Sequence, residues 1–354
     1  MTVAGRLGAP SHPFPDPPAE GGAVTIAEGV LWMRMALPMR LNHVNVYALD
    51  DGAAGWTVVD TGLDRAATRA AWEVLLAGAL GGRPVWRVLA THHHPDHIGL
   101  AGWFRSAHGA EVWTSRTAWL FARMLQLDVQ AAPSAEAVAF WRAAGMPGDI
   151  LAQRLAERPF NYADVVAPLP LGFRALGEGD VLRAGGREWD VRLGAGHAPD
   201  HITLWSRDDP LVLAGDQVLP RITPNLGVWP TEPEADPVAD FLASCDRLVA
   251  HARPDHLVLP GHQLPFLGLP ARLAAMAAHH RRALDQLVEA LAQPRTAAGC
   301  FDVLFGRRIG AGEYGLALGE AVAHLNRLRA EGRALRDQRD DGAWLWRATG
   351  DSAG

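Results

Sequence analysis

Thr91-His92-His93-His94-Pro95-Asp96-His97 is the stretch that decides the fold of this chain, because it puts four potential metal ligands within seven residues. It directly follows the apolar run Val85–Ala90, which has the composition of a buried strand. In an extended backbone, the first and third histidines of the stretch point to the same side. The proline then turns the chain, so that the Asp-His pair returns over the same point. The stretch therefore predicts a metal site at the end of a strand.

Three further candidate ligands follow apolar runs later in the chain. They are His197 in a Gly-His pair, Asp216 in a Gly-Asp pair and His262 in a Pro-Gly-His triplet. Taken singly, each pair is typical of an ordinary turn with a solvated side chain. Ligands of sheet-based sites, however, lie just beyond the ends of strands. Together with the first cluster, these residues predict one site that is assembled from distant parts of the chain.

The order of these motifs resembles the metallo-β-lactamase superfamily, in the branch that includes glyoxalase II and lactamase-like endoribonucleases. The earlier stretch Val58-Val59-Asp60-Thr61-Gly62 resembles the opening motif of the same superfamily, and the resemblance covers roughly residues 24 to 268. It implies a four-layer αββα sandwich and two divalent metal ions. The implied ligands are His92, His94 and His197 on one metal, Asp96, His97 and His262 on the other, and Asp216 as the bridge. The implied supporting residues are Asp60 and Thr91.

The chemistry of the donor set agrees with this assignment. Five imidazoles and two carboxylates without a thiolate suit Zn²⁺, with Fe or Mn as alternatives. Two metals that share a water lower its pKa toward ~7, which would give a bridging hydroxide nucleophile at neutral pH. We expect Asp96 to be catalytic as well as a ligand, by orienting that nucleophile or relaying its proton.

Several polar residues near these motifs are expected to play other roles. His201 lies four residues after His197, and we expect it to support a ligand by a hydrogen bond, since seven ligands already complete the pattern. Arg221 and Asn225 follow Asp216 and are candidate substrate-binding residues. We expect His43 and Asn45 to occupy core or edge positions of a strand rather than the site.

The domain organisation follows from changes in the sequence pattern. Residues 1–22 are rich in proline and have no periodic apolar face, which predicts a flexible arm. Residues 23–270 alternate strand-like and helical segments, which predicts an α/β catalytic domain. Its expected strands are Asn42–Leu49, Trp56–Asp60, Val85–Ala90, Glu188–Leu193, Ile202–Trp205, Pro210–Ala214 and Leu257–Leu259, and its expected helices include Ala66–Leu80 and Pro237–Ala252.

A helical insertion is expected at about residues 116–160, where Thr117–Leu127 and Ser134–Ala144 have helical periodicity. Its large apolar residues fit two interpretations. They form the insertion's own core, or they form an apolar lid that excludes water from an acyl or aromatic group. The residues concerned are Trp119, Phe121, Met124, Phe140, Trp141, Met146 and Phe160.

Residues 271–350 have the pattern of three helices and a β-hairpin, which predicts a winged helix. Ala321–Leu325 and Gly332-Arg333 resemble the third helix and wing of the C-terminal domain found in an animal lactamase-like endoribonuclease and in several thioester hydrolases. From residue 276 to residue 354 there are 11 Arg and 10 acidic residues. Because nucleic-acid binding depends on neutralising phosphates, we expect this domain to pack, dimerise or complete a pocket instead.

Composition excludes several broad classes. The 354 residues carry a formal net charge of −6, which argues against a strongly basic nucleic-acid binder. No apolar run approaches the ~18 residues of a membrane span, and residues 1–22 lack the pattern of an export signal. Cys245 and Cys300 lie outside any metal-binding pattern and are expected to be buried thiols. We therefore predict a cytoplasmic protein with no membrane partner, which could form a homodimer.

Four functions remain open. The first is a metallo-hydrolase of a thioester, ester or lactone of a small acyl substrate. The second is a phosphodiesterase or endoribonuclease on single-stranded RNA, which the tail resemblance supports and the charge balance weakens. The third is an iron-dependent sulfur dioxygenase, and the fourth is a non-enzymatic metal-dependent binding module. Glutathione specificity is not expected, since the tail differs from the basic helical tail of glyoxalase II, and β-lactam hydrolysis is disfavoured because those enzymes are exported.

Overall fold

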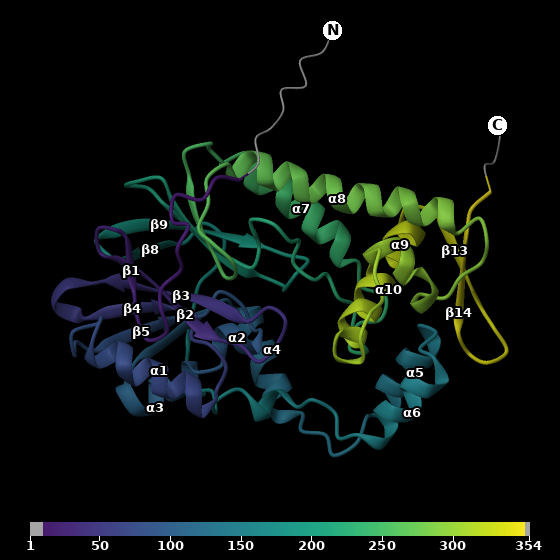
Figure 1. The fold of residues 1–354 in the computed structure, drawn as a ribbon, viewed down its shortest axis with the longest axis horizontal. Helices are drawn as coiled ribbons and strands as arrows, with labels where there is room; N and C mark the ends of the chain where they lie inside the picture. The colour runs from purple at the N-terminus through teal and green to yellow at the C-terminus, as the bar shows by residue number, and fades with distance from the viewer. Residues whose placement is uncertain (1–9, 351–354) are drawn as a thin grey trace, which may run out of the picture. The chain divides into compact units, whose positions relative to one another are not determined.

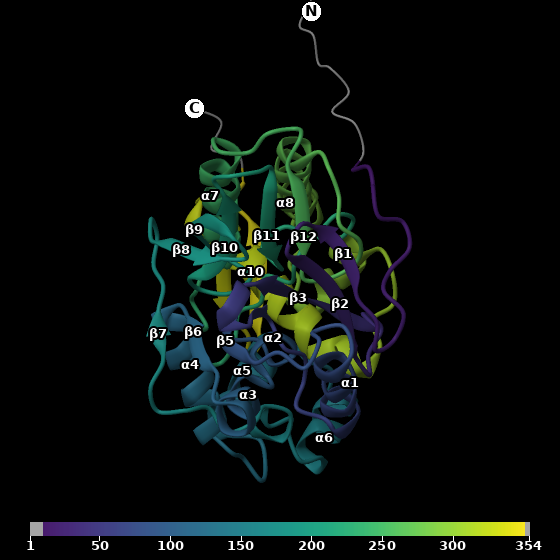
Figure 2. The ribbon, with the colours of Figure 1, turned by 90° about the vertical axis from the view of Figure 1, so that its left-hand side faces the viewer.

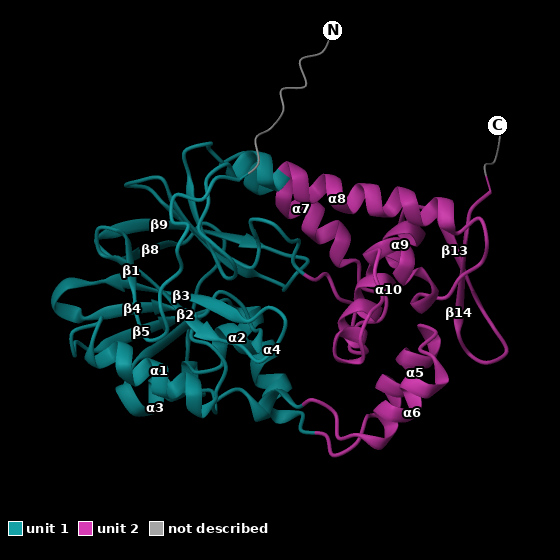
Figure 3. Cartoon of the chain, viewed as in Figure 1, with its two compact units in different colours: residues 1–129, 161–224, 247–273 teal, residues 130–160, 225–246, 274–354 magenta. Residues whose placement is uncertain are grey.

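The computed structural model describes residues 10–350, which form two compact units. Within the described residues, unit 1 comprises residues 10–129, 161–224 and 247–273, and unit 2 comprises residues 130–160, 225–246 and 274–350 (Figure 3). Each unit is built from segments that lie far apart in the sequence. In residues 10–350, no helix combines the length and the apolar character that crossing a bilayer would need.

Unit 1 contains two β-sheets (Figure 1). The seven-stranded sheet has the order β1-β2-β3-β4-β5-β6-β7, antiparallel as far as β4 and parallel beyond it. Its strands are β1 (Val24–Ala27), β2 (Val30–Ala36), β3 (His43–Asp50), β4 (Trp56–Val59), β5 (Val85–Leu89), β6 (Glu111–Thr114) and β7 (Arg174–Ala175).

The five-stranded sheet has the order β12-β11-β10-β9-β8, and only β11 and β12 run parallel among its described pairs. Its strands are β8 (Val181–Ala184), β9 (Arg187–Gly194), β10 (His201–Ser206), β11 (Leu211–Gly215) and β12 (Leu257–Pro260). The helices wholly within unit 1 are α1 (Ala66–Ala77), α2 (Pro95–Ile98), α3 (Ala101–His108) and α4 (Arg116–Leu127), with the short 3₁₀ turns η1 (Gly52–Ala54) and η2 (Tyr162–Asp164).

Two apolar cores hold the layers of unit 1 together. The core between the sheets joins Trp32 and Tyr47 of the larger sheet to Trp189 and Ile202 of the smaller one. The other core lies on the outer face of the larger sheet, where α1 and α3 cover it (Figure 2). Each fully buried side chain of this size contributes about 1.5–3 kcal/mol. The predicted α/β sandwich is confirmed.

Strand direction brings the site together. Strands β9, β11 and β12 end at the same edge of the smaller sheet, since β11 and β12 run parallel and His201 at the start of β10 pairs with Gly194 at the end of β9. The loop that follows β5 of the larger sheet meets them there, because its histidines lie close to His197, Asp216 and His262. The pairing of Gly215 with Pro260 places the Gly-Asp and Pro-Gly-His motifs side by side. The candidate ligands follow these ends directly.

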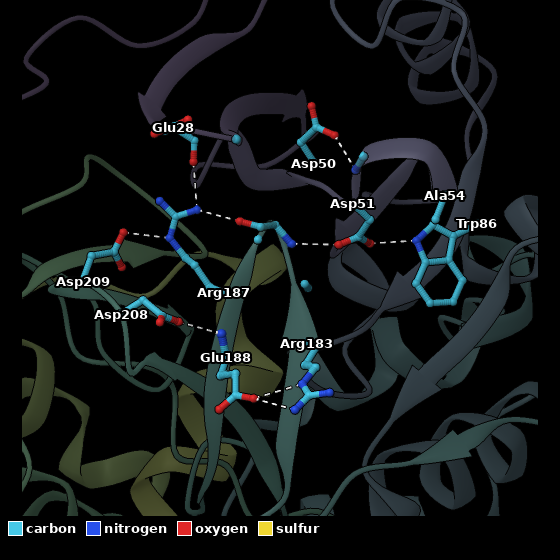
Figure 4. A pocket seen from close by; sticks show the side chains of 15 residues that line it. Glu28, Asp50, Asp51, Ala54, Trp86, Arg183, Arg187, Glu188, Asp208 and Asp209 are labelled. Carbon is cyan, nitrogen blue, oxygen red and sulfur yellow. Dashed lines mark hydrogen bonds and ion pairs between the residues drawn. The ribbon is translucent and has the colours of Figure 1, made fainter.

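The opposite edge of the sheets carries a hollow of about 1140 Å³ (Figure 4). Its acidic groups are largely satisfied within the protein. Asp51 accepts hydrogen bonds from the Gly185 N–H (2.7 Å) and the Trp86 indole (2.7 Å), and Arg187 pairs with Asp209 at 2.7 Å. This network joins the turns of the two sheets, and we regard it as structural.

Unit 2 is helical with one hairpin. Its elements are α5 (Ala135–Ala143), α6 (Gly148–Ala156), η3 (Ala298–Cys300), α9 (Phe301–Phe305), η4 (Ala311–Glu313), α10 (Tyr314–Ala330), β13 (Ala334–Gln338) and β14 (Trp344–Ala348). The helix α7 (Pro237–Val249) ends in unit 1, and α8 (Leu269–Ala290) begins there. Trp346 of β14 is fully buried, and its backbone exchanges two hydrogen bonds with Arg295. Cys245 and Cys300 are both buried, as the sequence analysis expects.

The structure departs from the expected boundaries in three places. The expected insertion is divided, because α4 belongs to unit 1 whereas α5 and α6 belong to unit 2. The expected arm is ordered from residue 10, where Ser11 forms a β-bridge with Leu267 and Phe14 packs on the core between the sheets; residues 1–9 lie outside the described part. The sequence pattern predicts the first helix of the C-terminal segment over His279–Ala292, whereas α8 begins ten residues earlier, at Leu269 in unit 1, and continues without a break.

Candidate metal centre

Side chains from four loops of unit 1 converge at the edge of the sheets where β9, β11 and β12 end. Three triplets have one donor atom from each residue within 4.8 Å of the others. The triplets are His92, His94 and His197; His92, His97 and Asp216; and Asp96, His97 and His262. The structure thus brings together all seven side chains that the sequence assigned as ligands.

The first loop is shaped by a one-turn helix. α2 begins at Pro95, which sits at the first helical position, where its fixed φ and missing N–H are favourable. His94 precedes it in an extended conformation, and His97 lies one turn further on. A backbone hydrogen bond fixes this turn, since the Thr61 N–H donates to the His97 carbonyl at 2.8 Å. This geometry explains why the Asp-His pair returns toward the first histidines.

Asp60 anchors this loop. Its backbone has φ +60°, a left-handed conformation that Asp tolerates better than most residues. Its carboxylate accepts from the Thr91 N–H at 2.8 Å and the Thr91 hydroxyl at 2.9 Å. It also accepts from His97 Nδ1 at 2.8 Å, which directs Nε2 of His97 into the site. Carboxylates commonly orient metal-binding histidines in this way.

His201 and Thr91 also contact the ligands. His201 Nε2 accepts the Asp216 N–H at 3.1 Å, and the His201 ring stacks on His92 with centroids 4.5 Å apart. The Thr91 hydroxyl accepts from His92 Nδ1 at 3.0 Å. The geometry therefore gives both residues supporting contacts around the seven ligands.

His43 and Asn45 contribute more than the sequence indicated, because they support His262. His262 Nδ1 donates to the His43 carbonyl at 2.6 Å. Asn45 Nδ2 donates to the Pro260 carbonyl at 2.9 Å, and the Asn45 N–H donates to the Gly261 carbonyl at 2.7 Å. A buried amide in an otherwise apolar strand was the available signal. It pointed to a core position, which is where Asn45 lies.

The two glycines before the ligands are required by close packing. A Cβ on Gly261 would lie 2.2 Å from Asp216 Oδ1 and 2.8 Å from His97 Cε1. Gly215 has φ +49°, and a Cβ there would lie 2.6 Å from His201 Cε1. Any larger residue would displace the donor atoms, so these glycines belong to the site.

The imidazoles of the site fall into two electrostatic classes. Burial, together with the neighbouring imidazoles, holds the pKa of His92 and of His94 well below the ordinary value. Burial also lowers the pKa of His97 and of His262, but the carboxylates outweigh it. The pKa of His97 is held well above its ordinary value by Asp216, Asp96 and Asp60, and the pKa of His262 is raised to about 10 by Asp216 and Asp96.

The carboxylates respond in the opposite sense. Burial raises the pKa of the Asp216 carboxyl, but His262 and His97 more than offset it and hold the pKa well below its ordinary range. The pKa of the Asp96 carboxyl is lowered for the same reason. Without metal, the site therefore stores protons on His97 and His262 that balance the buried carboxylates.

Metal binding should consequently release protons. Because the pKa of His262 is higher in the folded protein than in the unfolded chain, protonation of His262 stabilises the folded, metal-free protein. This contribution to the free energy of unfolding is complete below pH ~6.5 and is lost as the pH rises from 6.5 through about 10. In that window we expect metal affinity to rise about tenfold per pH unit for each imidazole that must lose a proton. Titration calorimetry in buffers of different ionisation enthalpy measures the number of protons released. Release of none, with a pH-independent affinity, would contradict this charge distribution.

The donor set fits divalent metal ions. His92 Nε2 and Asp216 Oδ1 are buried, and neither has a hydrogen-bond partner among residues 10–350. Burying a polar atom without a partner costs roughly 1–3 kcal/mol. Since the Nδ1 atoms of His92, His97 and His262 are held by protein oxygens, their Nε2 atoms face the common centre. This arrangement presents imidazole nitrogens and carboxylate oxygens that could bind cations.

The two candidate substrate-binding residues differ in their surroundings. Arg221 is exposed, and its N–H donates to Gln263 Oε1 at 3.1 Å, next to His262. Asn225 belongs to unit 2, where its amide donates to Glu320 at 2.7 Å. The structure therefore places Arg221 beside a ligand loop, whereas the Asn225 amide is engaged within unit 2.

The large residues of the expected insertion are also divided. The ring centroid of Phe121 on α4 lies 5.2 Å from that of His93, and His93 lies in the sequence between the candidate ligands His92 and His94. The Tyr162 hydroxyl donates to the His93 carbonyl at 2.5 Å. Phe140 and Met146 are buried within unit 2. In unit 1, α4 thus places Phe121 beside a ligand loop, whereas in unit 2 Phe140 and Met146 contribute to the core, as the first interpretation expects.

Known families and structures agree with this geometry. Residues 39–262 match the model of the metallo-β-lactamase superfamily, and residues 284–349 match that of the metallo-β-lactamase-like C-terminal domain. A crystal structure of a β-lactamase domain protein from Burkholderia ambifaria superposes with a TM-score of 0.89 at 37% identity, covering 96% of this chain and 98% of that chain.

Two curated proteins are similar over most of their length. A probable metallo-hydrolase of Bacillus subtilis (strain 168), YqjP, is 25% identical over 310 residues, which are 86% of this chain and 93% of YqjP. The acyl-coenzyme A thioesterase MBLAC2 of Gallus gallus is 28% identical over 249 residues, which are 67% of this chain and 78% of MBLAC2. The match over residues 39–262 includes strands β3 to β12 and every loop that carries a candidate ligand. This chain, with its converging histidines and aspartates, belongs to the metallo-β-lactamase superfamily of metallo-hydrolases.

Proposed function

We propose that this chain is a binuclear metal-dependent hydrolase of a carboxylic thioester, ester or lactone of a small acyl compound. The observation that carries the proposal is the overlap of the three donor triplets: the triplet of His92, His97 and Asp216 shares one histidine with each of the other two. Overlapping triplets provide for two neighbouring ions with common ligands, as in hydrolases of this type. Zn²⁺ suits this set of imidazoles and carboxylates, with Fe or Mn as alternatives. The proposed ligands are His92, His94 and His197 for one ion, Asp96, His97 and His262 for the other, and Asp216 between them.

The ions would supply an activated water and a Lewis acid for the substrate carbonyl. The chain's own contribution is to orient the ligands and to move a proton. The side chain of Asp96 is 18% exposed, whereas that of Asp216 is 8% exposed. Asp96 is therefore the ligand carboxylate that solvent reaches more easily. We propose Asp96 as the group that holds or relays the proton of the attacking water.

The acyl class is supported by similarity and by the surroundings of the site. The thioesterase MBLAC2 shares 28% of its residues with this chain over the aligned region. Phe121 provides an aromatic surface beside His93, and Leu120 and Met124 on the same helix are exposed. Apolar surface near a metal centre favours a substrate with an apolar acyl group over a phosphodiester.

RNA cleavage is less well supported, because most arginines of the C-terminal segment are engaged. Between residues 276 and 350, every arginine except Arg282 and Arg308 forms an ion pair with an acidic residue. Few guanidinium groups therefore remain for phosphates. We propose that this segment, as a winged-helix-like domain, serves packing, dimerisation or pocket completion.

A substrate screen tests the proposal. Metal-loaded protein should hydrolyse one or more acyl-coenzyme A, acyl-glutathione or lactone substrates and leave single-stranded RNA intact. His94→Ala removes one proposed ligand and should lose that activity, so it ties any activity to the metal site. Thioester cleavage is followed by the thiol released, and metal content is measured by elemental analysis.

Two results would overturn the proposal. One is a fully loaded enzyme that leaves every acyl substrate untouched and cuts RNA. The other is purified protein that contains iron and consumes oxygen with a sulfur substrate, which would indicate a dioxygenase on the same fold.

A further inference from the structure

Helix α4 is tied to the loop that carries His197. The helix begins after Ser115, whose hydroxyl caps it by accepting the Ala118 N–H at 3.1 Å. In its first turn, the Thr117 hydroxyl donates to the carboxylate of Asp200, 83 residues further along the chain. Asp200 lies between the ligand His197 and the supporting residue His201. One hydrogen bond thus connects a helix to a ligand loop.

The backbone of Asp200 shows that this position is specialised. Its φ is +48°, in the left-handed region that glycine adopts without cost and that other residues enter at some expense. A glycine would make the same turn but would have no side chain to accept from Thr117. Asp is among the residues that tolerate this conformation best, and it also provides a charged acceptor. The residue type therefore fits both the turn and the hydrogen bond.

The position of α4 matters because of what the helix carries. Phe121 lies one turn after Thr117, on the same face of the helix. Its ring is 5.2 Å from His93, which lies between His92 and His94 in the sequence. On the core side, Ala118 and Ala122 are fully buried and leave the helix close to the sheet. Fixing the first turn of α4 therefore fixes the aromatic surface next to the metal ligands.

We propose that the Thr117–Asp200 hydrogen bond positions α4 so that Phe121 contacts the acyl group of the substrate, which makes both residues positioning residues for substrate binding. This inference rests on the proposed acyl hydrolase function. Loss of the hydrogen bond leaves the seven ligands in place but frees the first turn of α4. Binding of the acyl group should weaken more than the chemical step does.

Matched variants of both partners test the inference. Thr117→Val keeps the shape of the side chain and removes the donor, while Thr117→Ser keeps the donor. Asp200→Gly keeps the turn and removes the acceptor, while Asp200→Asn keeps an acceptor. We expect Thr117→Val and Asp200→Gly each to raise KM for an acyl thioester about tenfold with kcat nearly unchanged, as for loss of a hydrogen bond to a charged group. The double variant Thr117→Val/Asp200→Gly should have the same KM as either single variant. The variants Thr117→Ser and Asp200→Asn should keep the KM of the unsubstituted protein.

A second measurement does not depend on any substrate. Hydrogen exchange of the amides of residues 116–127 should speed up in Thr117→Val and Asp200→Gly but not in the Ser and Asn variants, with metal content unchanged. Additive effects of the two changes, or unchanged exchange in α4, would overturn the inference. If exchange responds but no acyl substrate is hydrolysed, the hydrogen bond positions α4 and the proposed function fails. If thioesters are hydrolysed and exchange does not respond, the function stands and this inference fails.

Discussion

Asp216→Asn should reduce hydrolytic activity by about 10²- to 10³-fold, the range seen when one preorganised group that stabilises the reacting centre is lost. Asp216 Oδ2 lies 3.1 Å from His262 Nε2, and it lies 3.5 Å from Nε2 of both His97 and His197. The asparagine has nearly the same shape, but it is neutral and has only one acceptor oxygen. Asp216→Asn therefore removes a negative charge that raises the pKa values of His97 and His262. It also removes the carboxylate proposed to lie between the two metal ions.

Steady-state kinetics and elemental analysis of the same preparation measure this effect. Asp255→Asn is the matched control, because it makes the same chemical change at an exposed residue that pairs with Arg253 on the surface. It should leave activity and metal content unchanged. Full activity and full metal content in Asp216→Asn would contradict the central place of this carboxylate.

Removing the metal should lower the free energy of unfolding of unit 1. A ligand that binds only the folded state at about 1,000 times its dissociation constant contributes about 4 kcal/mol. For a unit of about 200 residues, that corresponds to a fall in Tm of roughly 10 °C. The physical reason is that buried donors such as His92 Nε2 lose their partner and the buried carboxylates repel one another.

Thermal unfolding before and after chelation tests this expectation, with added Zn²⁺ as the reversal. Activity should be lost on chelation and return with the metal. The effect should be larger at pH 8 than at pH 6.5, since protons on His97 and His262 partly replace the metal at the lower pH. A Tm that does not change on chelation at pH 8 would show that metal does not stabilise the fold.

The strands and the first ligand loop could be predicted because their signals are local. The apolar run ending at Leu89 and the proline at position 95 specify a buried strand and a turn by short-range rules. Strands β9 to β12 each lie within about two residues of the expected positions. The boundaries of helices were less predictable, as α8 shows, because a helix continues where packing supports it.

Contacts that join distant segments left no readable local signal. His43 supports His262 from 219 residues away, and Thr117 reaches Asp200 across 83 residues. In the sequence, each is one polar residue among many, and its partner depends on how strands pair and where loops meet. The same is true of the division of the expected insertion between two units.

The amino-acid sequence was sufficient to identify the superfamily and the seven candidate ligands, because metal ligands must be of a few residue types and recur in a fixed order along this fold. The folded chain was needed to show what holds those ligands: Asp60 on His97, His43 on His262 and α4 against the His197 loop. These contacts depend on distances between segments, and such distances exist only once the sheets have packed against each other.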